Sequence, residues 1–425
     1  MRIGIIGSGG SGMSAAWLLD KNHDVTLFEK RNYLGGHTHS VEVILNGKNH
    51  IIDDGAAWFS PSIYPYFNAY LDIVGVEFDW IPLSLTYYNQ SKQQVNCMPP
   101  VTARNILAMF TSRTTLPELL ALNKAVNAAK TIVANKQTSV DFKTFIDGLS
   151  VSEKIKENFL KPLLSGLWGA PYDETNTFSI YPLMKYIVYH KPSGLQYYNW
   201  KTMKGGTKNY IATVHKNLKK TTTILNAEVQ KIEFNKENNT VQVFTKDNTY
   251  SFDKLIITGG ARDSAMLLKN SIDYNQAFEI LNQFKCYKAT LATHSDVSLM
   301  PPDRKDWSVV NVTFNGVDSY ATIWHGSKNN EDIFCSYINP DNGLPKNLHH
   351  TSEWWLPCET PEFYQLQNQL ATVQGINNVY LGGDYTHDIG SHEDAILSSV
   401  NAVEKIAPDS ERLIELKKAA ALYKG

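Results

Sequence analysis

Residues 2–19 read RIGIIGSGGSGMSAAWLL, which is an apolar run, a glycine cluster and a second apolar run. This order predicts a strand over residues 2–6, a tight turn and then a helix. The glycines have GxGxxG spacing, in which the first permits the turn, the second lets the backbone approach a phosphate, and the third lets the helix pack on the strand. Since a helix amino terminus attracts anions, we predict a Rossmann-like unit that binds a dinucleotide pyrophosphate. Its binding residues are expected to be Gly7, Gly9, Gly10, Ser11 and Gly12.

A second predicted strand, residues 25–28, ends at Glu29. An acidic residue about 20 positions after the glycines is placed to accept hydrogen bonds from the ribose hydroxyls of an adenosine. Chance glycine turns rarely carry the strand, the glycines and the acid together. We therefore predict that Glu29 binds the adenosine ribose.

The next segment, residues 30–38, reads KRNYLGGHT and contains a second glycine doublet. A plain nicotinamide-binding fold has no use for a doublet at this place. The segment resembles the GG motif of the flavin amine oxidase superfamily, in which the backbone passes close to the FAD pyrophosphate and ribityl chain. His37 stands where an arginine is common, which weakens the charge contact with the phosphates. The resemblance implies that FAD is bound by Lys30, Gly35, Gly36, His37 and Thr38.

Residues 379–384, VYLGGD, form a short apolar run that ends in glycines and an acid, and a helix is predicted from about Glu393. The free amides of a helix amino terminus suit the electron-rich edge of a reduced flavin. The run resembles the carboxy-terminal flavin motif of the same superfamily. The resemblance implies that Gly383 and Asp384 contact the ribityl chain, and that the backbone of Ser391 and His392 lies near the flavin pyrimidine.

Because cofactor motifs stand at both ends of the chain, we expect a discontinuous α/β fold. Residues 1–82, 195–275 and 368–410 are predicted to form a Rossmann-like FAD-binding domain. Residues 83–194 and 276–367 are predicted to form an inserted α+β substrate-binding domain, as in amine oxidases and protoporphyrinogen oxidases, with residues 411–425 as a C-terminal tail. The resemblance also implies that a strand over residues 223–233 packs its backbone against the adenine at Val229.

Composition bounds the function further. The 425 residues predict two or three domains, and a net charge of −2 argues against a nucleic-acid partner. The four cysteines lack CxxC spacing, so we expect neither a metal site nor a disulfide framework. The chain starts directly with a strand, which leaves no room for a signal peptide, and it has no apolar run of about 18 residues. We therefore predict a cytoplasmic protein; its oligomeric state is left open.

Residues 117–133 carry an apolar stripe at helical spacing that includes Leu122, Val126, Ala129 and Val133. Two interpretations stay open. The stripe faces the core, or it makes peripheral contact with a membrane or an acyl-chain substrate.

Residues 294–301, 306–311 and 391–394 show a narrower resemblance, to a bacterial branch described as predicted NAD/FAD-binding proteins. That branch is often associated with enzymes that modify lipid acyl chains. The resemblance implies an FAD-dependent oxidoreductase that takes hydride onto flavin N5 from a small, largely apolar substrate, with O2 or another acceptor reoxidising the flavin. The alternatives are an amine oxidase that produces an aldehyde or imine, a non-redox flavin isomerase and a structural flavoprotein.

Two residues are candidates for the chemistry. Lys288 is the possible counterpart of a lysine that bridges flavin N5 through a water in many of these oxidases, or else an exposed lysine at a strand end. His392 titrates near neutrality, so it is either a general acid or base, or a hydrogen-bonding partner of the flavin or of Asp394. Cys358 lies near the position at which some amine oxidases attach the flavin, but its local sequence differs, and we predict non-covalent FAD.

Overall fold

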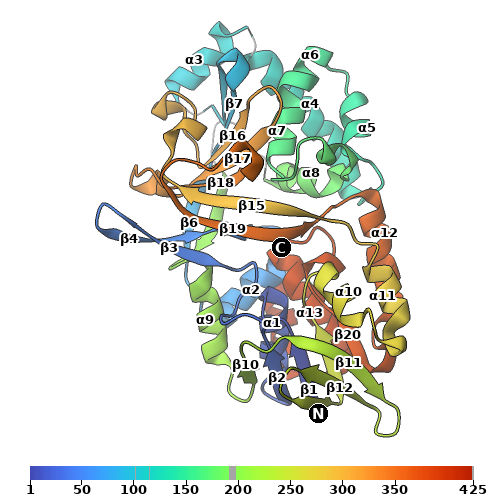
Figure 1. Cartoon of the computed structure of the whole chain (residues 1–425). Coiled ribbons are helices and arrows are strands. Elements are labelled where there is room, and N and C mark those ends of the chain that lie inside the picture. Colours follow the sequence, from blue (N-terminus) through green and yellow to red (C-terminus); the bar gives the residue numbers. More distant parts are fainter. Residues whose placement is uncertain (101, 114, 191–197, 424–425) are drawn as a thin grey trace.

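The structure is a computed structural model that describes residues 1–100, 102–113, 115–190 and 198–423 (Figure 1). A five-stranded parallel sheet lies at the end of the molecule that holds the amino terminus. Its strands, in spatial order, are β10 (Thr222–Ile224), β2 (Asp24–Phe28), β1 (Arg2–Ile6), β14 (Lys254–Ile257) and β20 (Val379–Leu381). Three distant stretches of chain therefore meet in one sheet. The predicted α/β class with a Rossmann-like parallel sheet is confirmed.

Apolar residues of the central strands hold this sheet together. Ile5 of β1 pairs with Leu27 of β2 on one side and with Ile256 of β14 on the other, and all three side chains are fully buried. Strands that are apolar on both faces are typical of parallel sheets covered by helices. The helices around this sheet are α1 (Gly10–Leu19), α2 (Pro65–Val74), α9 (Thr207–Asn217), α10 (Ala261–Leu268), α11 (Asn275–Leu281), α13 (His392–Ile406) and α14 (Glu411–Leu422).

A second sheet of seven strands lies across the middle and the opposite end of the molecule (Figure 1). It is antiparallel except where β16 and β7 run parallel. Its spatial order is β19 (Leu348–Pro357), β15 (Cys286–His294), β18 (Phe334–Ile338), β17 (Ser319–Trp324), β16 (Val310–Phe314), β7 (Leu85–Asn89) and β8 (Gln94–Met98).

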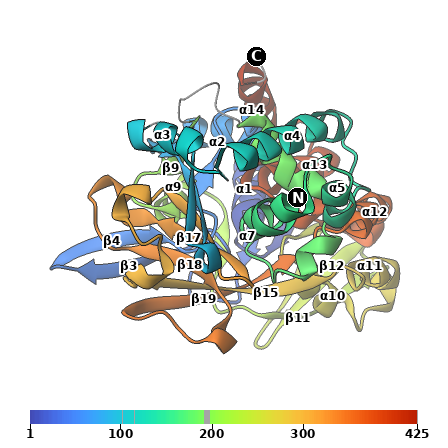
Figure 2. The ribbon, with the colours of Figure 1, turned by 90° about the horizontal axis from the view of Figure 1, so that it is seen from above.

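Helices gather on one side of the second sheet, and the hairpin of β3 (Ser40–Leu45) and β4 (Lys48–Asp53) projects on the other (Figure 2). These helices are α4 (Thr115–Ala134), α5 (Phe142–Asp147), α6 (Glu153–Ile155), a π-helical turn (Lys156–Leu160), α7 (Lys161–Gly166) and α8 (Ile180–Tyr189). Helix α3 (Ala103–Thr111) precedes them in the chain. Helix α12 (Pro361–Leu370) follows β19. Two small sheets complete the fold, β5 (Trp58–Phe59), β9 (Tyr198–Met203) and β6 (Phe78–Leu83), and β11 (Val229–Asn235), β12 (Thr240–Thr245) and β13 (Thr249–Phe252).

The single strand predicted over residues 223–233 is wrong, because the chain forms two strands there. β10 joins the parallel sheet, and β11 starts a separate antiparallel sheet. Between them the backbone turns at Asn226, which has a φ of +53°. The amide of Ala227 donates to the carbonyl of Glu29 over 2.9 Å, so this turn is fastened beside the end of β2.

The apolar stripe of α4 faces the core. Val126, Ala129 and Val133 are buried together with residues of α8, and Leu122 is half-buried. The exposed apolar side chains near this end of the molecule belong to other positions, such as Leu107 and Phe110 of α3. Among the described residues no helix combines the length and the apolar character needed to cross a bilayer.

Candidate functional site

The glycine turn after β1 has the geometry that the sequence predicts. Gly7 has a φ of +100° and donates its amide to Phe28 over 2.9 Å. A Cβ on Gly12 would lie 1.9 Å from the Gly7 carbonyl oxygen, so only glycine fits there. A Cβ on Gly9, in contrast, would meet nothing closer than the Gly35 carbonyl at 3.9 Å. Helix α1 begins at Gly10 without a side-chain cap, which leaves an open cradle at its amino terminus.

The second glycine doublet lies over this cradle. Gly35 donates its amide to the Ser8 carbonyl over 3.0 Å, and a Cβ on Gly36 would lie 3.2 Å from the Cα of Gly9. The buried Thr38 closes the loop by donating its amide to Gly35 over 2.9 Å. The two glycine motifs therefore form one continuous backbone surface.

Glu29 lies at the end of β2 and is buried beside the glycine turn. Its Oε2 accepts from the Ser8 amide at 3.1 Å and from the Ser8 hydroxyl at 2.5 Å, and its Oε1 accepts from the Arg31 amide at 2.9 Å. Each carboxylate oxygen can accept two hydrogen bonds, so Oε1 keeps acceptor capacity for another donor. Val229 begins β11 just after the turn that Ala227 fastens to Glu29.

Lys30 lies on the outer side of this region. Its ammonium group forms an ion pair with Asp263 over 2.8 Å, and about half of its side chain is exposed. The structure therefore places the backbone of Lys30 near the predicted ribose site, while its charge is directed to solvent.

The carboxy-terminal motif adjoins the glycine turn. The Gly383 amide donates to the Ser398 hydroxyl over 3.1 Å, and that hydroxyl lies 3.2 Å from the hydroxyl of Ser11. Asp384 and His37 are close enough for their charges to interact. Burial raises the pKa of the Asp384 carboxyl and lowers the pKa of the His37 imidazole.

Helix α13 begins immediately beyond this motif. Ser391 caps it, because the Ser391 hydroxyl accepts from the Asp394 amide at 3.3 Å while the Asp394 carboxylate accepts from the Ser391 amide at 2.9 Å. The ring of His392 stacks on Phe67 with centroids 4.6 Å apart. Its Nε2 atom is buried and has no partner among the described residues.

The expectation that His392 titrates near neutrality is wrong. Burial lowers its pKa to about 4, against the opposing effect of a backbone hydrogen bond with Ala56. Asp394 is not its partner either, since the Asp394 carboxylate lies 2.9 Å from Nδ1 of His387. His392 is therefore a neutral imidazole at physiological pH.

Lys288 does not join this group of residues. It lies on β15 with its side chain exposed, and its Nζ is 2.6 Å from the Glu353 carboxylate on β19. Its neighbours Tyr287 and Ala289 point to the opposite, buried face of the same strand. The position matches an exposed lysine near a strand end.

Strand β19 brings two further residues to the site that the sequence patterns did not indicate. The Trp354 indole donates to the Asp54 carbonyl over 2.9 Å, and its ring lies 4.9 Å from that of His37. Glu359 follows the end of β19, and its Oε1 would lie 3.8 Å from a Cβ on Gly390, just before α13. Alternation along β19 could have marked Trp354 as inward-facing, whereas Glu359 stands in a connection without periodicity.

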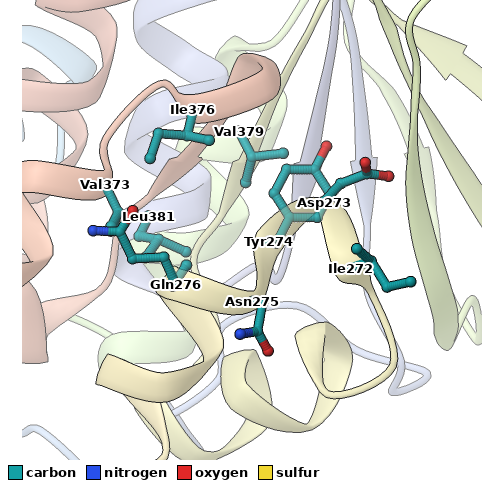
Figure 3. A pocket seen from close by; sticks show the side chains of 10 residues that line it. Ile272, Asp273, Tyr274, Asn275, Gln276, Val373, Ile376, Val379 and Leu381 are labelled. Carbon is teal, nitrogen blue, oxygen red and sulfur yellow. The ribbon is translucent and has the colours of Figure 1, made fainter.

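The hollow in Figure 3 lies away from these residues. It has a volume of about 180 Å³ and is lined by residues next to β20 and α11, such as Tyr274, Val379 and Leu381. A second hollow of about 240 Å³ lies between β4, β9 and the turn after β17. Neither is lined by a residue predicted to bind the cofactor. Within the described ranges no three His, Cys, Asp or Glu side chains are grouped so that they could hold a metal ion.

A parallel sheet with two glycine loops at its carboxyl edge defines a dinucleotide-binding protein. The family model described as flavin containing amine oxidoreductase matches residues 11–315. The chain therefore belongs to that family of FAD-dependent oxidoreductases.

Several solved structures share this fold. The chain resembles a CLA-producing fatty acid isomerase from P. acnes, with a TM-score of 0.69, 15% identity and coverage of 96% of this chain and 98% of that chain. It resembles wild-type putrescine oxidase bound to putrescine, with a TM-score of 0.66, 14% identity and coverage of 96% and 99%. It also resembles cyclohexylamine oxidase from Brevibacterium oxydans IH-35A, with a TM-score of 0.63, 13% identity and coverage of 100% and 99%. A comparison with curated proteins found no match.

The residues present fit a flavin dinucleotide. The surface over Gly9 is open where a pyrophosphate needs close backbone contact, and the uncapped start of α1 supplies amide donors. At the far end, the buried Nε2 of His392 lacks a partner among the described residues and stands at the start of α13. Open backbone and an unpartnered polar atom are what a bound cofactor would cover and satisfy.

Proposed function

We propose that this protein is an FAD-dependent oxidoreductase that removes a hydride from a largely apolar substrate, such as an acyl chain or another lipid. The bound flavin would supply the two-electron chemistry at its N5 atom, and O2 or another acceptor would take the electrons afterwards. The protein's part is to hold the cofactor, to orient the substrate C–H bond and to exclude water.

The proposed cofactor contacts follow the chain. The glycine turn, through Gly7, Gly9, Gly10, Ser11 and Gly12, would hold the pyrophosphate, and Glu29 would accept the ribose hydroxyls. The backbone at Lys30 and Val229 would lie along the adenosine. The loop from Gly35 to Thr38 and the Gly383–Asp384 pair would hold the ribityl chain. The amides of Ser391 and His392 would face the flavin pyrimidine, with His392 as a neutral hydrogen-bonding partner.

We propose that FAD is bound without a covalent link. Covalent attachment through Cys358 would need a reactive thiolate. Burial raises the pKa of the Cys358 thiol to about 12, so the sulfur is protonated at physiological pH. A protonated thiol is a poor nucleophile.

The proposal of an apolar substrate rests on the face of the second sheet beside Trp354. A cluster of buried, mostly apolar side chains covers that face, and it extends to half-buried Trp168 and Leu356. Its buried members are Ala170, Phe178, Tyr287, Ala289, Leu291, Cys335 and Trp354. Since Trp354 also contacts His37, this face would lie on the substrate side of the cofactor. The fatty acid isomerase of similar fold is a protein whose substrate class suits such a surface.

Ser391 weakens the alternative of amine oxidation. The resemblance of the carboxy-terminal motif to that of amine oxidases implies that Ser391 stands where those enzymes frame the substrate nitrogen with an aromatic ring. In this chain the Ser391 hydroxyl is used in the cap of α13. The structure offers no role at N5 to Lys288, whose charge is paired with Glu353. We therefore propose no catalytic function for it.

Location and membrane contact are proposed separately. We propose a cytoplasmic location. Peripheral contact with a membrane would be made through α3, because Leu107 and Phe110 are exposed there.

The experiment is anaerobic addition of fatty acyl lipids and then of amines to the FAD-loaded protein, with the visible flavin absorbance recorded after each. Bleaching by acyl lipids alone supports the proposal. Bleaching by amines alone, with aldehyde and ammonia as products, would replace it with amine oxidation. Conversion of a lipid without net reduction would indicate an isomerase, and no response to either class would leave a structural flavoprotein.

A further inference from the structure

Glu359 occupies the junction between the second sheet and the start of α13. It follows the end of β19, and its backbone carbonyl accepts from the Ser179 amide over 2.7 Å, which fixes the chain at the start of α8. Its carboxyl is directed to Gly390, the residue before the cap of α13. The Glu359 carboxyl therefore lies beside Gly390, and the amides proposed to contact the flavin begin at the next residue, Ser391.

The carboxyl of Glu359 has few hydrogen-bonding or charged partners among the described residues. Its Oε2 accepts from the Trp168 indole over a long 3.4 Å, and within the described ranges no lysine, arginine or histidine forms an ion pair with it. It caps none of the described helices, and the residue is half-buried. A carboxylate held partly out of water without a cationic partner is costly, and such groups concentrate at functional sites.

The charged groups around Glu359 are already partnered. Three acids act on it, two from the segment that leads into α13 and one from the first turn of that helix. Asp388 is paired with Lys185 over 2.6 Å, Asp394 lies 2.9 Å from His387, and Asp384 interacts with His37. Its other titratable neighbours are neutral at physiological pH, because burial raises the pKa of each: Tyr186 on α8, Tyr287 on β15, Tyr364 on α12 and Cys358.

Burial, reinforced by the three acids, raises the pKa of Glu359 to about 8. The carboxyl is therefore mostly protonated at pH 7 and becomes a carboxylate above pH 8. Efficient acid–base groups have a pKa near the working pH.

We propose that Glu359 exchanges a proton with the substrate during oxidation. The inference rests on the proposed function and deepens it. When a substrate C–H bond gives its hydrogen and both bonding electrons to the flavin, the cation left behind must lose a proton. In this step a second C–H or N–H bond breaks, its electron pair stays on the substrate to form a double bond, and the Glu359 carboxylate accepts the proton as a new O–H bond. The substrate loses two hydrogens in total, and the two electrons reside on the flavin.

The test compares Glu359→Gln with the control Glu353→Gln. Glu353 lies on β19, six residues before Glu359, but it is exposed and paired with Lys288. With no substrate present, the visible absorbance of the FAD-loaded proteins is recorded from about pH 6 to about pH 9. We expect a spectral change centred near pH 8 in the wild type and in Glu353→Gln, and none in Glu359→Gln.

The second readout is the anaerobic rate of flavin reduction by the first compound that bleaches the wild type. We expect this rate to rise about tenfold per pH unit below the pKa of Glu359 and to fall at least about 100-fold, with no pH dependence, in Glu359→Gln. Glu359→Asp keeps a carboxyl and should retain the pH dependence at a lower rate. This variant still tests the inference if Glu359→Gln does not fold.

Two outcomes overturn the inference. One is a flavin-loaded Glu359→Gln protein with the wild-type rate and pH profile. The other is the absence of any Glu359-dependent spectral change near pH 8. Failure of the proposed function looks different, since the wild type then binds no flavin or is reduced by no compound. The substrate-free titration still decides the inference when flavin binds but nothing reduces it.

Discussion

Gly9 and Gly12 are three residues apart, yet a side chain would act differently at each. Above Gly9 there is open space over the cradle, whereas a Cβ on Gly12 would collide with the backbone of Gly7 at 1.9 Å. We therefore propose that the first glycine serves a ligand, whereas the second is required by the turn itself. This difference gives a pair of variants that separates cofactor binding from folding.

We expect Gly9→Val to fold but to lose FAD, because its side chain fills the space that the pyrophosphate needs. Gly12→Ala should lose FAD and also about 1–3 kcal/mol of unfolding free energy, since the turn must shift. Flavin absorbance after purification and urea unfolding monitored by circular dichroism measure the two effects. A Gly9→Val protein with a full complement of flavin would show that the cradle is assigned wrongly.

Glu359 also predicts a dependence of stability on pH. Its pKa in the folded chain, about 8, is above its ordinary value of 4.5. The folded protein therefore holds the proton that the unfolded chain releases, so unfolding free energy falls as the pH rises between these two values. In the flavin-free protein, the melting temperature of Glu359→Gln should therefore increase relative to that of the wild type as the pH rises over this range. A constant difference between the two proteins would contradict the raised pKa.

Single residues also show where sequence reasoning ends. The glycine turn and Glu29 could be predicted because their roles depend on local spacing. The sequence did not settle whether Lys288 faces the site, since strand alternation fixes two faces without saying which is inside. The pKa of His392 depends on the ring of Phe67, which lies more than 300 positions away in the chain. Glu359 carries no local signal at all.

Among the elements, the parallel strands and helices α1 and α13 followed from apolar runs and glycine signals. Strands β15, β16 and β17 belong to the second sheet. The pairing of β16 with β7 could not be predicted, because it joins segments more than 200 positions apart. The turn at Asn226 was missed because its fastening partner is the carbonyl of Glu29.

Helix α14 was not predicted, although its sequence has a helical pattern of apolar residues. Leu413, Leu416 and Ala420 recur at helical spacing and are buried, although residues 411–425 were predicted as a C-terminal tail. The helix packs on α2, where the Tyr423 hydroxyl donates to Asp72. The buried face of the helix therefore belongs to the core beside the parallel sheet.

We expect Leu416→Ala to lower the unfolding free energy by about 2–5 kcal/mol, because it leaves a cavity in a closed core. Leu422→Ala, at a side chain that is 85% exposed, is the matched control and should change stability by less than about 0.5 kcal/mol. Urea unfolding followed by circular dichroism measures both. Equal stability of the two variants would mean that α14 is not docked.

At the scale of the whole molecule, the candidate site is assembled from segments that lie hundreds of residues apart. The glycine turn, the second doublet and the start of α13 meet at one edge of the parallel sheet, and β19 brings the second sheet to the same place. A ligand held there contacts all of them together. Binding should therefore stabilise distant segments as one unit.

We expect FAD to slow hydrogen exchange of backbone amides in residues 7–12, 35–38 and 383–394 together, and in β19 around Trp354. Exchange monitored by mass spectrometry with and without FAD measures this. Residues 103–111 in α3 are the internal control and should not change. Protection confined to residues 7–12 would indicate a nucleotide that does not reach α13.

The central claim is that the two glycine loops and the start of α13 bind one FAD without a covalent bond. The most direct measurement is the visible absorbance of the purified protein after reconstitution with excess FAD and removal of the unbound cofactor, followed by denaturation. We expect about one flavin per chain, released completely into solution when the protein unfolds. No flavin spectrum after reconstitution would contradict the claim of FAD binding, and flavin that stays on the unfolded chain would contradict non-covalent binding.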